Sequence, residues 1–216
     1  MAQAVMLIGK SGSGKSTSMR NFASDELALI NVNKKPLPFK GKFDSTLETT
    51  QYELIMKAIG QTQKKAIVID DAGYLITAQF MNGHGENKGN AVFELYNSLA
   101  DNFYKLIKFC QEKISDDKIV YFVMHEDKNE FGETKPKTIG KMLDEKVCVE
   151  GLFTIVLRAE CKEGKYIFHT KTDGLDVTKS PMGMFEEEEI DNDLKKVDSI
   201  IRDYYELAPL KTKGDK

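Results

Sequence analysis

Short apolar runs alternate with longer segments of helical periodicity over the first 125 residues. Four runs have the length and apolar content of buried strands: residues 4–8, 27–32, 65–71 and 119–124. Residues 46–59 and 91–114 place apolar side chains at helical spacing. Between them, Pro36 and Pro38 predict an extended connector over residues 34–39. This alternation predicts a parallel sheet with helices on both faces.

The pattern changes in the last third of the chain. Residues 152–159 and 166–171 predict two strands that form an antiparallel hairpin at the sheet edge. The acidic run 186–189 predicts a solvated segment, and a helix is expected from Asp191, capped by Asp191 or Asn192. The expected buried face of that helix is Leu194, Val197, Ile201 and Tyr204. The fold class is therefore α/β, a mostly parallel sheet flanked by helices, with a C-terminal antiparallel hairpin and a terminal helix.

Composition fits one domain of ordinary size. The chain has 216 residues and 41% apolar content, which is enough to fill a core, and we expect a single domain over residues 1–208 with a flexible tail over 209–216. Three scattered cysteines make no disulfide framework, and no apolar stretch approaches membrane-spanning length. We therefore expect a soluble cytoplasmic protein without a membrane partner, in the bacterial host's cytoplasm if a phage encodes it.

The first apolar run leads directly into a glycine-rich motif. Residues 9–16 read GKSGSGKS, which has the form G-x-x-x-x-G-K-[ST] of a phosphate-binding loop, or P-loop. A strand precedes this loop, and residues 16–23 are expected to open a helix after it. The predicted nucleotide-binding residues are Gly9, Lys10, Ser11, Gly12, Ser13, Gly14, Lys15, Ser16 and Thr17.

The residue types in the loop suit a nucleoside triphosphate. Glycines let the backbone approach a phosphate closely, and successive N–H groups supply oriented positive charge. Lys15 adds a mobile charge for the β- and γ-phosphates, and the Ser16 hydroxyl is a ligand for Mg²⁺.

Three further polar residues end the next apolar runs. Asp70 lies at the carboxyl end of the run 65–71 and is expected to hold hydrated Mg²⁺ together with Ser16. Asp71 points to the other side of the strand end and is the candidate that polarises the attacking water. His125 ends the run 119–124, where an imidazole can contact the terminal phosphate.

Two polar segments are expected to be loops at the same sheet edge, over residues 81–90 and 126–138. Lysines and an aromatic residue suit the phosphates and exposed bases of a single-stranded nucleic acid, although a plain solvated loop has the same composition. The candidate DNA contacts are Lys88, Lys128, Phe131, Lys135 and Lys137.

The assembled motifs resemble the bacteriophage RecA-like ATPases, which are AAA-type P-loop NTPases associated with single-strand annealing and recombination. The resemblance rests on residues 9–16, 67–71, 121–125, 141–146 and 178–185. It implies a RecA-like ATPase domain that uses ATP and Mg²⁺, binds single-stranded DNA and works beside a single-strand-binding protein. It also implies a homo-oligomer, ring or filament, with nucleotide at the subunit interfaces.

The same resemblance places the DNA-facing loops at residues 73–90 and 126–138. A lysine from the neighbouring subunit is expected to complete the active site, and of Lys171 and Lys179 we favour Lys179. No glutamate follows the second strand as a general base, so Asp71 has to serve or hydrolysis is slow.

Two other functions fit the motif. A small-molecule kinase would use residues 126–138 as a lid, but such kinases clamp phosphates with several arginines, and of 31 basic residues only Arg20, Arg158 and Arg202 are arginines. A nucleotide-gated protein-binding module with little turnover is the second alternative. The net charge of −3 neither supports nor excludes DNA binding.

Overall fold

The computed structural model describes residues 2–85, 89–140 and 142–210. The strands are β1 (Gln3–Gly9), β2 (Leu27–Asn31), β3 (Ser45–Leu47), β4 (Ala66–Asp70), β5 (Ile119–Lys128), β6 (Thr134–Pro136), β7 (Ile155–Lys162), β8 (Lys165–His169) and β9 (Glu189–Asp191). The α-helices are α1 (Tyr52–Gln61), α2 (Gly73–Gly83), α3 (Asn90–Lys113) and α4 (Leu194–Tyr204). Three shorter helical segments are η1 (Ser16–Asn21), η2 (Met142–Val147) and η3 (Val149–Leu152).

The described strands form one sheet in the order β3-β2-β4-β5-β1-β7-β8-β9, with β6 paired to β5. The pairs from β3 through to β7 are parallel, whereas β7–β8, β8–β9 and β5–β6 are antiparallel. The predicted α/β class, with its mostly parallel sheet and its C-terminal hairpin, is confirmed.

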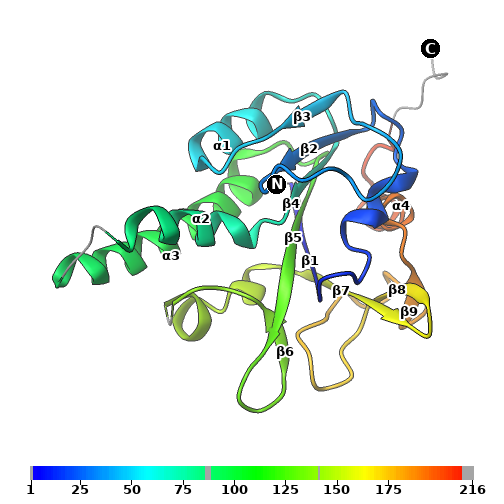
Figure 1. Cartoon of the computed structure of the whole chain (residues 1–216). Helices are drawn as coiled ribbons and strands as arrows, with labels where there is room; N and C mark the ends of the chain where they lie inside the picture. The colour runs from blue at the N-terminus through cyan, green and yellow to red at the C-terminus, as the bar shows by residue number, and fades with distance from the viewer. Residues whose placement is uncertain (1, 86–88, 141, 211–216) are drawn as a thin grey trace.

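Helices cover both faces of the sheet (Figure 1). On one face α1, α2 and α3 bury apolar side chains such as Ile55, Leu75 and Phe103 against the sheet. On the other face η1 and α4 bury Met19 and Leu194. Because both faces are covered, the central strands are apolar at nearly every position, and β1, β4 and β5 carry continuous runs of buried residues.

Two predicted helices differ from the observed ones. Residues 16–23 form only the six-residue 3₁₀ helix η1, because Ser, Thr and Asn are weak helix formers and Phe22 is already extended. The helix expected over 46–59 begins later, at Tyr52, since Ser45–Leu47 pairs with β2 as a parallel strand. Residues 91–114 agree closely with α3.

Both DNA-facing loops that the resemblance implies contain regular secondary structure. Residues 73–83 are the helix α2, which buries Leu75 and Ile76, so the loop expected over 73–90 is wrong for this part. Residues 126–138 are a β-hairpin, because β5 continues through Lys128 and pairs with β6. The antiparallel pairing gives this segment a fixed backbone rather than that of a flexible loop.

The terminal helix is capped differently from the prediction. Asp193 is the N-cap, and its side chain accepts hydrogen bonds from the backbone N–H groups of Lys195 and Lys196. Leu194, Val197 and Ile201 are buried as expected, but Tyr204 is 40% exposed. The buried face is completed instead by Asp198 and Arg202. Of the predicted flexible tail over residues 209–216, residues 211–216 lie outside the described part of the chain.

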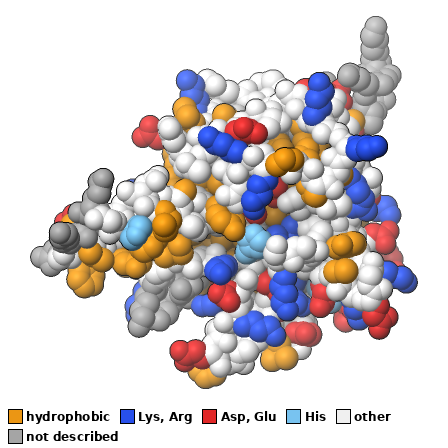
Figure 2. All heavy atoms as spheres, viewed as in Figure 1, with side chains coloured by type: hydrophobic (Ala, Val, Ile, Leu, Met, Phe, Trp, Pro, Cys, Tyr) orange, Lys and Arg blue, Asp and Glu red, His pale blue; other side chains and the backbone are white. Residues whose placement is uncertain are grey.

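Helices α2 and α3 lie side by side and extend away from the sheet as an arm (Figure 1). Apolar side chains gather on this arm, whereas charges of both signs are spread over the rest of the face shown in Figure 2. Met81 and Phe93 are among the exposed apolar residues there. In the described part of the chain, no helix combines the length and apolar character needed to cross a membrane.

Candidate functional site

The sheet order brings the predicted site residues to one edge. Strands β1, β5 and β4 are consecutive and parallel, so their carboxyl ends meet there. The P-loop follows β1, His125 lies near the end of the parallel part of β5, and Asp70 ends β4. Since β5 separates β1 from β4, Asp70 faces the P-loop across one intervening strand.

The glycines of the P-loop have different roles. Gly12 and Gly14 have φ angles of 79° and 88°, in the left-handed region that favours glycine. Gly9 is required for space, because a Cβ there would lie 2.5 Å from Ser13 Oγ and 2.6 Å from the Ala159 carbonyl oxygen. The loop therefore depends on backbone shape at two positions and on close packing at the third.

Lys15 is folded back onto its own loop. Its Nζ donates hydrogen bonds of 2.7 Å to the carbonyl oxygens of Gly9 and Lys10, and the residue is 6% exposed. Burial lowers the pKa of Lys15, although the carboxylates of Asp71 and Asp70 oppose this shift. A buried ammonium group whose hydrogen-bond acceptors are two neutral carbonyls is stabilised further by an anionic partner. This property favours the binding of phosphate.

Ser16 and Asp70 form the contact expected of a magnesium site. The Ser16 hydroxyl donates a hydrogen bond of 2.9 Å to Asp70 Oδ1. Burial raises the pKa of Asp70 to about 6, and the adjacent Asp71 charge adds to the increase. A nearby cation stabilises the ionised form of such a buried carboxylate. The carboxylate and the adjacent hydroxyl are oxygen ligands of the kind that bind Mg²⁺ together with phosphate oxygens and water.

Asp71 is held by three partners. Asn33 Nδ2 donates to its Oδ2 at 2.6 Å, Lys35 Nζ lies 3.1 Å from the same oxygen, and His125 Nε2 lies 3.4 Å from Oδ1. Burial raises the pKa of Asp71, but hydrogen bonds from His125, Asn33 and Lys35 outweigh it, so the net pKa lies well below the usual range. Its φ of 59° lies in the left-handed region, and Asp is one of the residues that tolerate this conformation.

Tyr74 supports the partners of Asp71 from the start of α2. Its ring makes an edge contact with the His125 ring, with the centroids 5.7 Å apart. Lys35 Nζ lies 5.3 Å from the centroid of the same ring, in a cation–π arrangement. The aromatic ring therefore fixes both His125 and Lys35 beside the carboxylate.

These groups surround one cavity of about 320 Å³. Of the nine predicted nucleotide-binding residues, those that line it are Ser11, Gly12, Gly14, Lys15, Ser16 and Thr17. Asp70, Asp71 and His125 line it as well. Gly9, Lys10 and Ser13 do not line it; Lys10 and Ser13 line a second cavity of about 190 Å³ beside Glu126 and Arg158.

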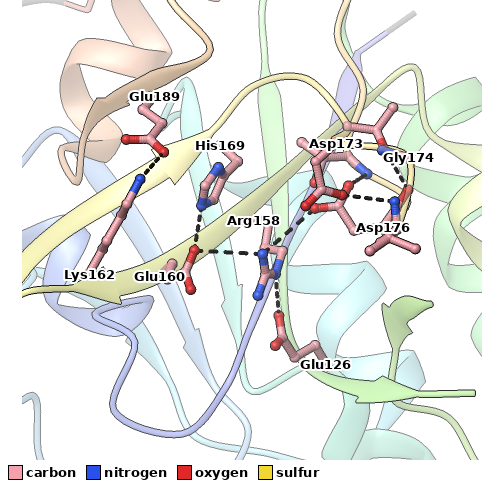
Figure 3. A network of polar contacts seen from close by, with 12 residues as sticks. Glu126, Arg158, Glu160, Lys162, His169, Asp173, Gly174, Asp176 and Glu189 are labelled. Carbon is pink, nitrogen blue, oxygen red and sulfur yellow. Dashed lines mark hydrogen bonds and ion pairs between the residues drawn. The ribbon is translucent and has the colours of Figure 1, made fainter. Parts of the chain in front are cut away.

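An ionic network that is buried at Glu126 and Asp176 lies beside this second cavity (Figure 3). Arg158 on β7 contacts Glu126 Oε2 at 3.0 Å, Glu160 Oε2 at 3.7 Å and Asp176 Oδ2 at 3.8 Å. His169 on β8 lies 2.6 Å from the same Glu160 oxygen. Glu126 belongs to β5, directly after His125, so this network joins the root of the β5–β6 hairpin to β7.

Other predicted residues are not brought to the cavity. Lys179 is anchored by backbone hydrogen bonds to Val156 on β7 and is not among the residues that line the cavity of its own chain. Lys128, Phe131, Lys135 and Lys137 line a separate depression on the β5–β6 hairpin. Lys88 lies outside the described residues.

Several residues that line the cavity or hold its groups were not predicted from the sequence: Asn33, Lys35, Pro36, Pro38, Tyr74 and Tyr166. Asn33 and Lys35 follow the carboxyl end of β2, which pairs with β4, so their position after a parallel strand was an available signal. Tyr166 comes from β8, about 150 residues from the P-loop in sequence. No local pattern marks Tyr166, because only the sheet order places β8 near the loop.

A family model described as an AAA domain matches residues 1–182. The matched region contains the P-loop, both acidic residues, His125 and the β7–β8 hairpin, and it ends before α4. Among curated proteins, none matches this chain.

Proposed function

This chain belongs to the AAA domain family of P-loop ATPases, and from that premise we propose that it is an ATPase stimulated by single-stranded DNA, acting in phage recombination or annealing. Members of the family generally use ATP and Mg²⁺. The observation that carries the proposal is the path of β5, which runs from the nucleotide cavity into a hairpin with an exposed aromatic tip.

The strand β5 connects two surfaces directly. His125 lines the nucleotide cavity and contacts Asp71, and three residues later the same strand reaches Lys128 in the hairpin. A paired strand is stiff, so a shift of His125 on nucleotide binding or hydrolysis displaces the root of the hairpin. The same path carries the effect of a ligand on the hairpin back to the cavity, because coupling between sites is reciprocal.

The hairpin has the features of a platform for unpaired bases. Phe131 at its tip is 84% exposed, and its ring offers a face on which a base can stack. The lysines at 128, 135 and 137 are offset by Glu126, Asp127, Glu130 and Glu133, so the segment 126–138 carries no net positive charge. Stacking, with local lysine–phosphate contacts, is therefore the expected mode of binding rather than a general electrostatic attraction.

The cavity residues suit hydrolysis of a triphosphate. Lys15 exchanges its two backbone carbonyls for the β- and γ-phosphates, and Ser16 and Asp70 are the residues that would hold Mg²⁺, which neutralises charge on those phosphates. Asp71 is kept ionised and orients the attacking water, while His125 donates a hydrogen bond to the terminal phosphate.

Assembly belongs to the same proposal. We place the nucleotide between neighbouring subunits of a homo-oligomer, with Lys179 of one copy reaching the cavity of the next, and we place single-strand-binding protein beside it as a partner. Lys179 is held by its backbone beside β7 and does not line the cavity of its own chain, so a contact with nucleotide requires a second copy.

The test is an ATPase assay with and without single-stranded DNA, repeated over a range of salt concentrations and combined with measurement of molecular size. We expect ATP turnover to rise with DNA, and the size to increase when ATP is present. Lys15→Ala is expected to abolish turnover. Turnover that does not respond to DNA at any salt concentration contradicts the proposed substrate, while a monomer under all conditions contradicts the proposed assembly.

The role of the hairpin is tested by a matched pair of exposed apolar residues. Phe131→Ala is expected to remove most of the DNA stimulation, because stacking contributes about 1–3 kcal/mol per base. Met182→Ala is the control, since Met182 is 97% exposed but lies outside the hairpin. If DNA stimulates Phe131→Ala as strongly as it stimulates Met182→Ala and the wild-type protein, the Phe131 ring does not contribute to DNA binding.

A further inference from the structure

Tyr166 occupies the opposite side of the nucleotide cavity from the acidic residues. The strand order β4-β5-β1-β7-β8 places Asp70 two strands to one side of β1 and Tyr166 two strands to the other. Both residues line the cavity that the P-loop borders. Adjacent strands are about 4.8 Å apart, and four such spacings lie between β4 and β8. The two walls are therefore separated by roughly the length of a nucleotide.

The Tyr166 ring lies against the P-loop itself. A Cβ on Gly14 would be 2.8 Å from Tyr166 Cδ1, so the loop backbone and the ring are in direct contact. Tyr166 and Phe168 point to the same side of β8, where Phe168 is fully buried in the core beside Met19 and Leu194. That core covers Phe168 but not Tyr166, which remains 50% exposed.

The positions of the other groups fix the direction in which a nucleotide lies. Ser16, Asp70 and Asp71 mark the end of the cavity where metal and terminal phosphate belong. A triphosphate anchored there directs its nucleoside towards the opposite wall. We propose that Tyr166 is the platform on which the base of the bound nucleotide stacks.

The exposed ring is suited to this role. A planar heteroaromatic base covers a half-exposed aromatic face at little conformational cost, because Tyr has few rotatable bonds, and the backbone of Tyr166 is held by pairing with Cys161 on β7 and by a hydrogen bond that its carbonyl oxygen accepts from the Asn192 N–H. Stacking is tolerant of base identity, so Tyr166 is expected to strengthen nucleotide binding without selecting strongly among bases. The proposal rests on the proposed function only in requiring that the cavity binds a nucleotide.

The alternative role for Tyr166 is to support the P-loop by packing on Gly14. The two roles differ in their effect on a ligand that has phosphates but no base. Loss of a stacking platform weakens nucleotide binding alone, whereas collapse of the loop weakens nucleotide and bare triphosphate together.

The experiment is calorimetric titration with a non-hydrolysable ATP analogue and, separately, with inorganic tripolyphosphate, both with Mg²⁺. Tyr166→Leu keeps an apolar contact for Gly14 but removes the aromatic face. It is expected to bind the ATP analogue about tenfold more weakly and tripolyphosphate as tightly as the wild-type protein does. Tyr166→Phe is expected to bind both ligands normally, because it retains the ring.

Tyr104→Leu on α3 is the matched control, since Tyr104 is 40% exposed but does not line the cavity. Unchanged affinity of Tyr166→Leu for the ATP analogue would overturn the stacking role, and so would an equal loss for both ligands. Neither result bears on DNA stimulation, which is measured separately. A wild-type protein that binds neither ligand would instead contradict nucleotide binding, and the inference would fail with it.

Discussion

Asp71 and Asp70 are adjacent carboxylates with opposite electrostatic surroundings. Burial and a like charge raise the pKa of Asp70 to about 6, so its ionised form gains from a cation. The hydrogen bonds from His125, Asn33 and Lys35 keep the pKa of Asp71 low and its carboxylate ionised. This difference supports the proposed roles, metal binding for Asp70 and orientation of water for Asp71, because a strongly stabilised carboxylate is a weak proton acceptor but a fixed hydrogen-bond acceptor.

Asp71→Asn therefore separates binding from turnover. We expect the turnover number to fall about 10²-fold, because the amide loses the charge that polarises water, while the affinity for ATP changes little. Steady-state kinetics and equilibrium titration measure the two quantities. The control is Asp116→Asn, since Asp116 is an exposed carboxylate outside the cavity. A variant that hydrolyses ATP at the wild-type rate would remove Asp71 from the mechanism.

Residue types alone predicted much of the cavity wall. Most of the P-loop residues, together with Asp70, Asp71 and His125, line the cavity as expected, because each follows or ends a parallel strand, whereas Gly9, Lys10 and Ser13 do not line it. Lys35 and Tyr166 were missed, since their local sequence is that of a connector and of an ordinary hairpin. Their positions depend on which strands are neighbours, and hydrophobic periodicity does not encode that order.

At the scale of elements, the Arg158 network stabilises the root of the β5–β6 hairpin. Arg158 comes from β7, Glu126 from β5, and Asp176 from the segment that pairs with β6 at Thr134. Glu126 and Asp176 have side chains only 2% and 4% exposed. Their charges therefore depend on a single guanidinium group among the contacts shown in Figure 3.

Replacing the Arg158 guanidinium group is expected to destabilise the folded protein. Arg158→Met leaves buried carboxylates without their counter-charge, and we expect the free energy of unfolding to fall by about 3–5 kcal/mol. Urea denaturation measures this change. The control, Lys57→Met, removes an exposed positive charge on α1 and is expected to change stability by less than about 0.5 kcal/mol. Similar stability of the two variants would mean that the network is solvated.

The elements themselves were predicted unevenly. Long periodic segments such as α3 agree with the sequence, because a helix of 24 residues repeats its apolar face many times. Residues 81–90 and 126–138 were predicted to be loops from their composition, and the resemblance extended the first loop to 73–90, yet residues 73–83 form α2 and residues 126–128 extend β5. Tertiary packing of a few apolar side chains, and pairing with β6, decided these cases.

At the scale of the whole molecule, a buried polar triad fastens α4 to the sheet. The Tyr121 hydroxyl on β5 donates a hydrogen bond of 2.9 Å to Asp198, which also accepts from Arg202 at 2.5 Å. Arg202 donates further to the carbonyl oxygens of Lys65, Asp117 and Ala208. The triad thus joins the last helix to the amino ends of β4 and β5, on the opposite edge of the sheet from the cavity.

Tyr121→Phe tests this connection without changing side-chain volume. Asp198 then lacks one donor while remaining fully buried, so we expect a loss of about 1.5–3 kcal/mol of stability, and faster hydrogen exchange in α4. Tyr104→Phe, at an exposed position on α3, is the control and is expected to leave both measurements unchanged. Wild-type exchange in α4 of the Tyr121 variant would show that apolar packing alone holds the helix.

The sequence by itself determined the fold class, the P-loop and the acidic strand end. Each depends on residues close together in the chain, where glycine conformation, apolar runs and spacing act directly. The tertiary structure decided which strands are neighbours, and with them the partners of Asp71, the Arg158 network and the place of Tyr166 at the cavity. These contacts join residues far apart in sequence, and such contacts are set by packing of the complete sheet rather than by any local pattern.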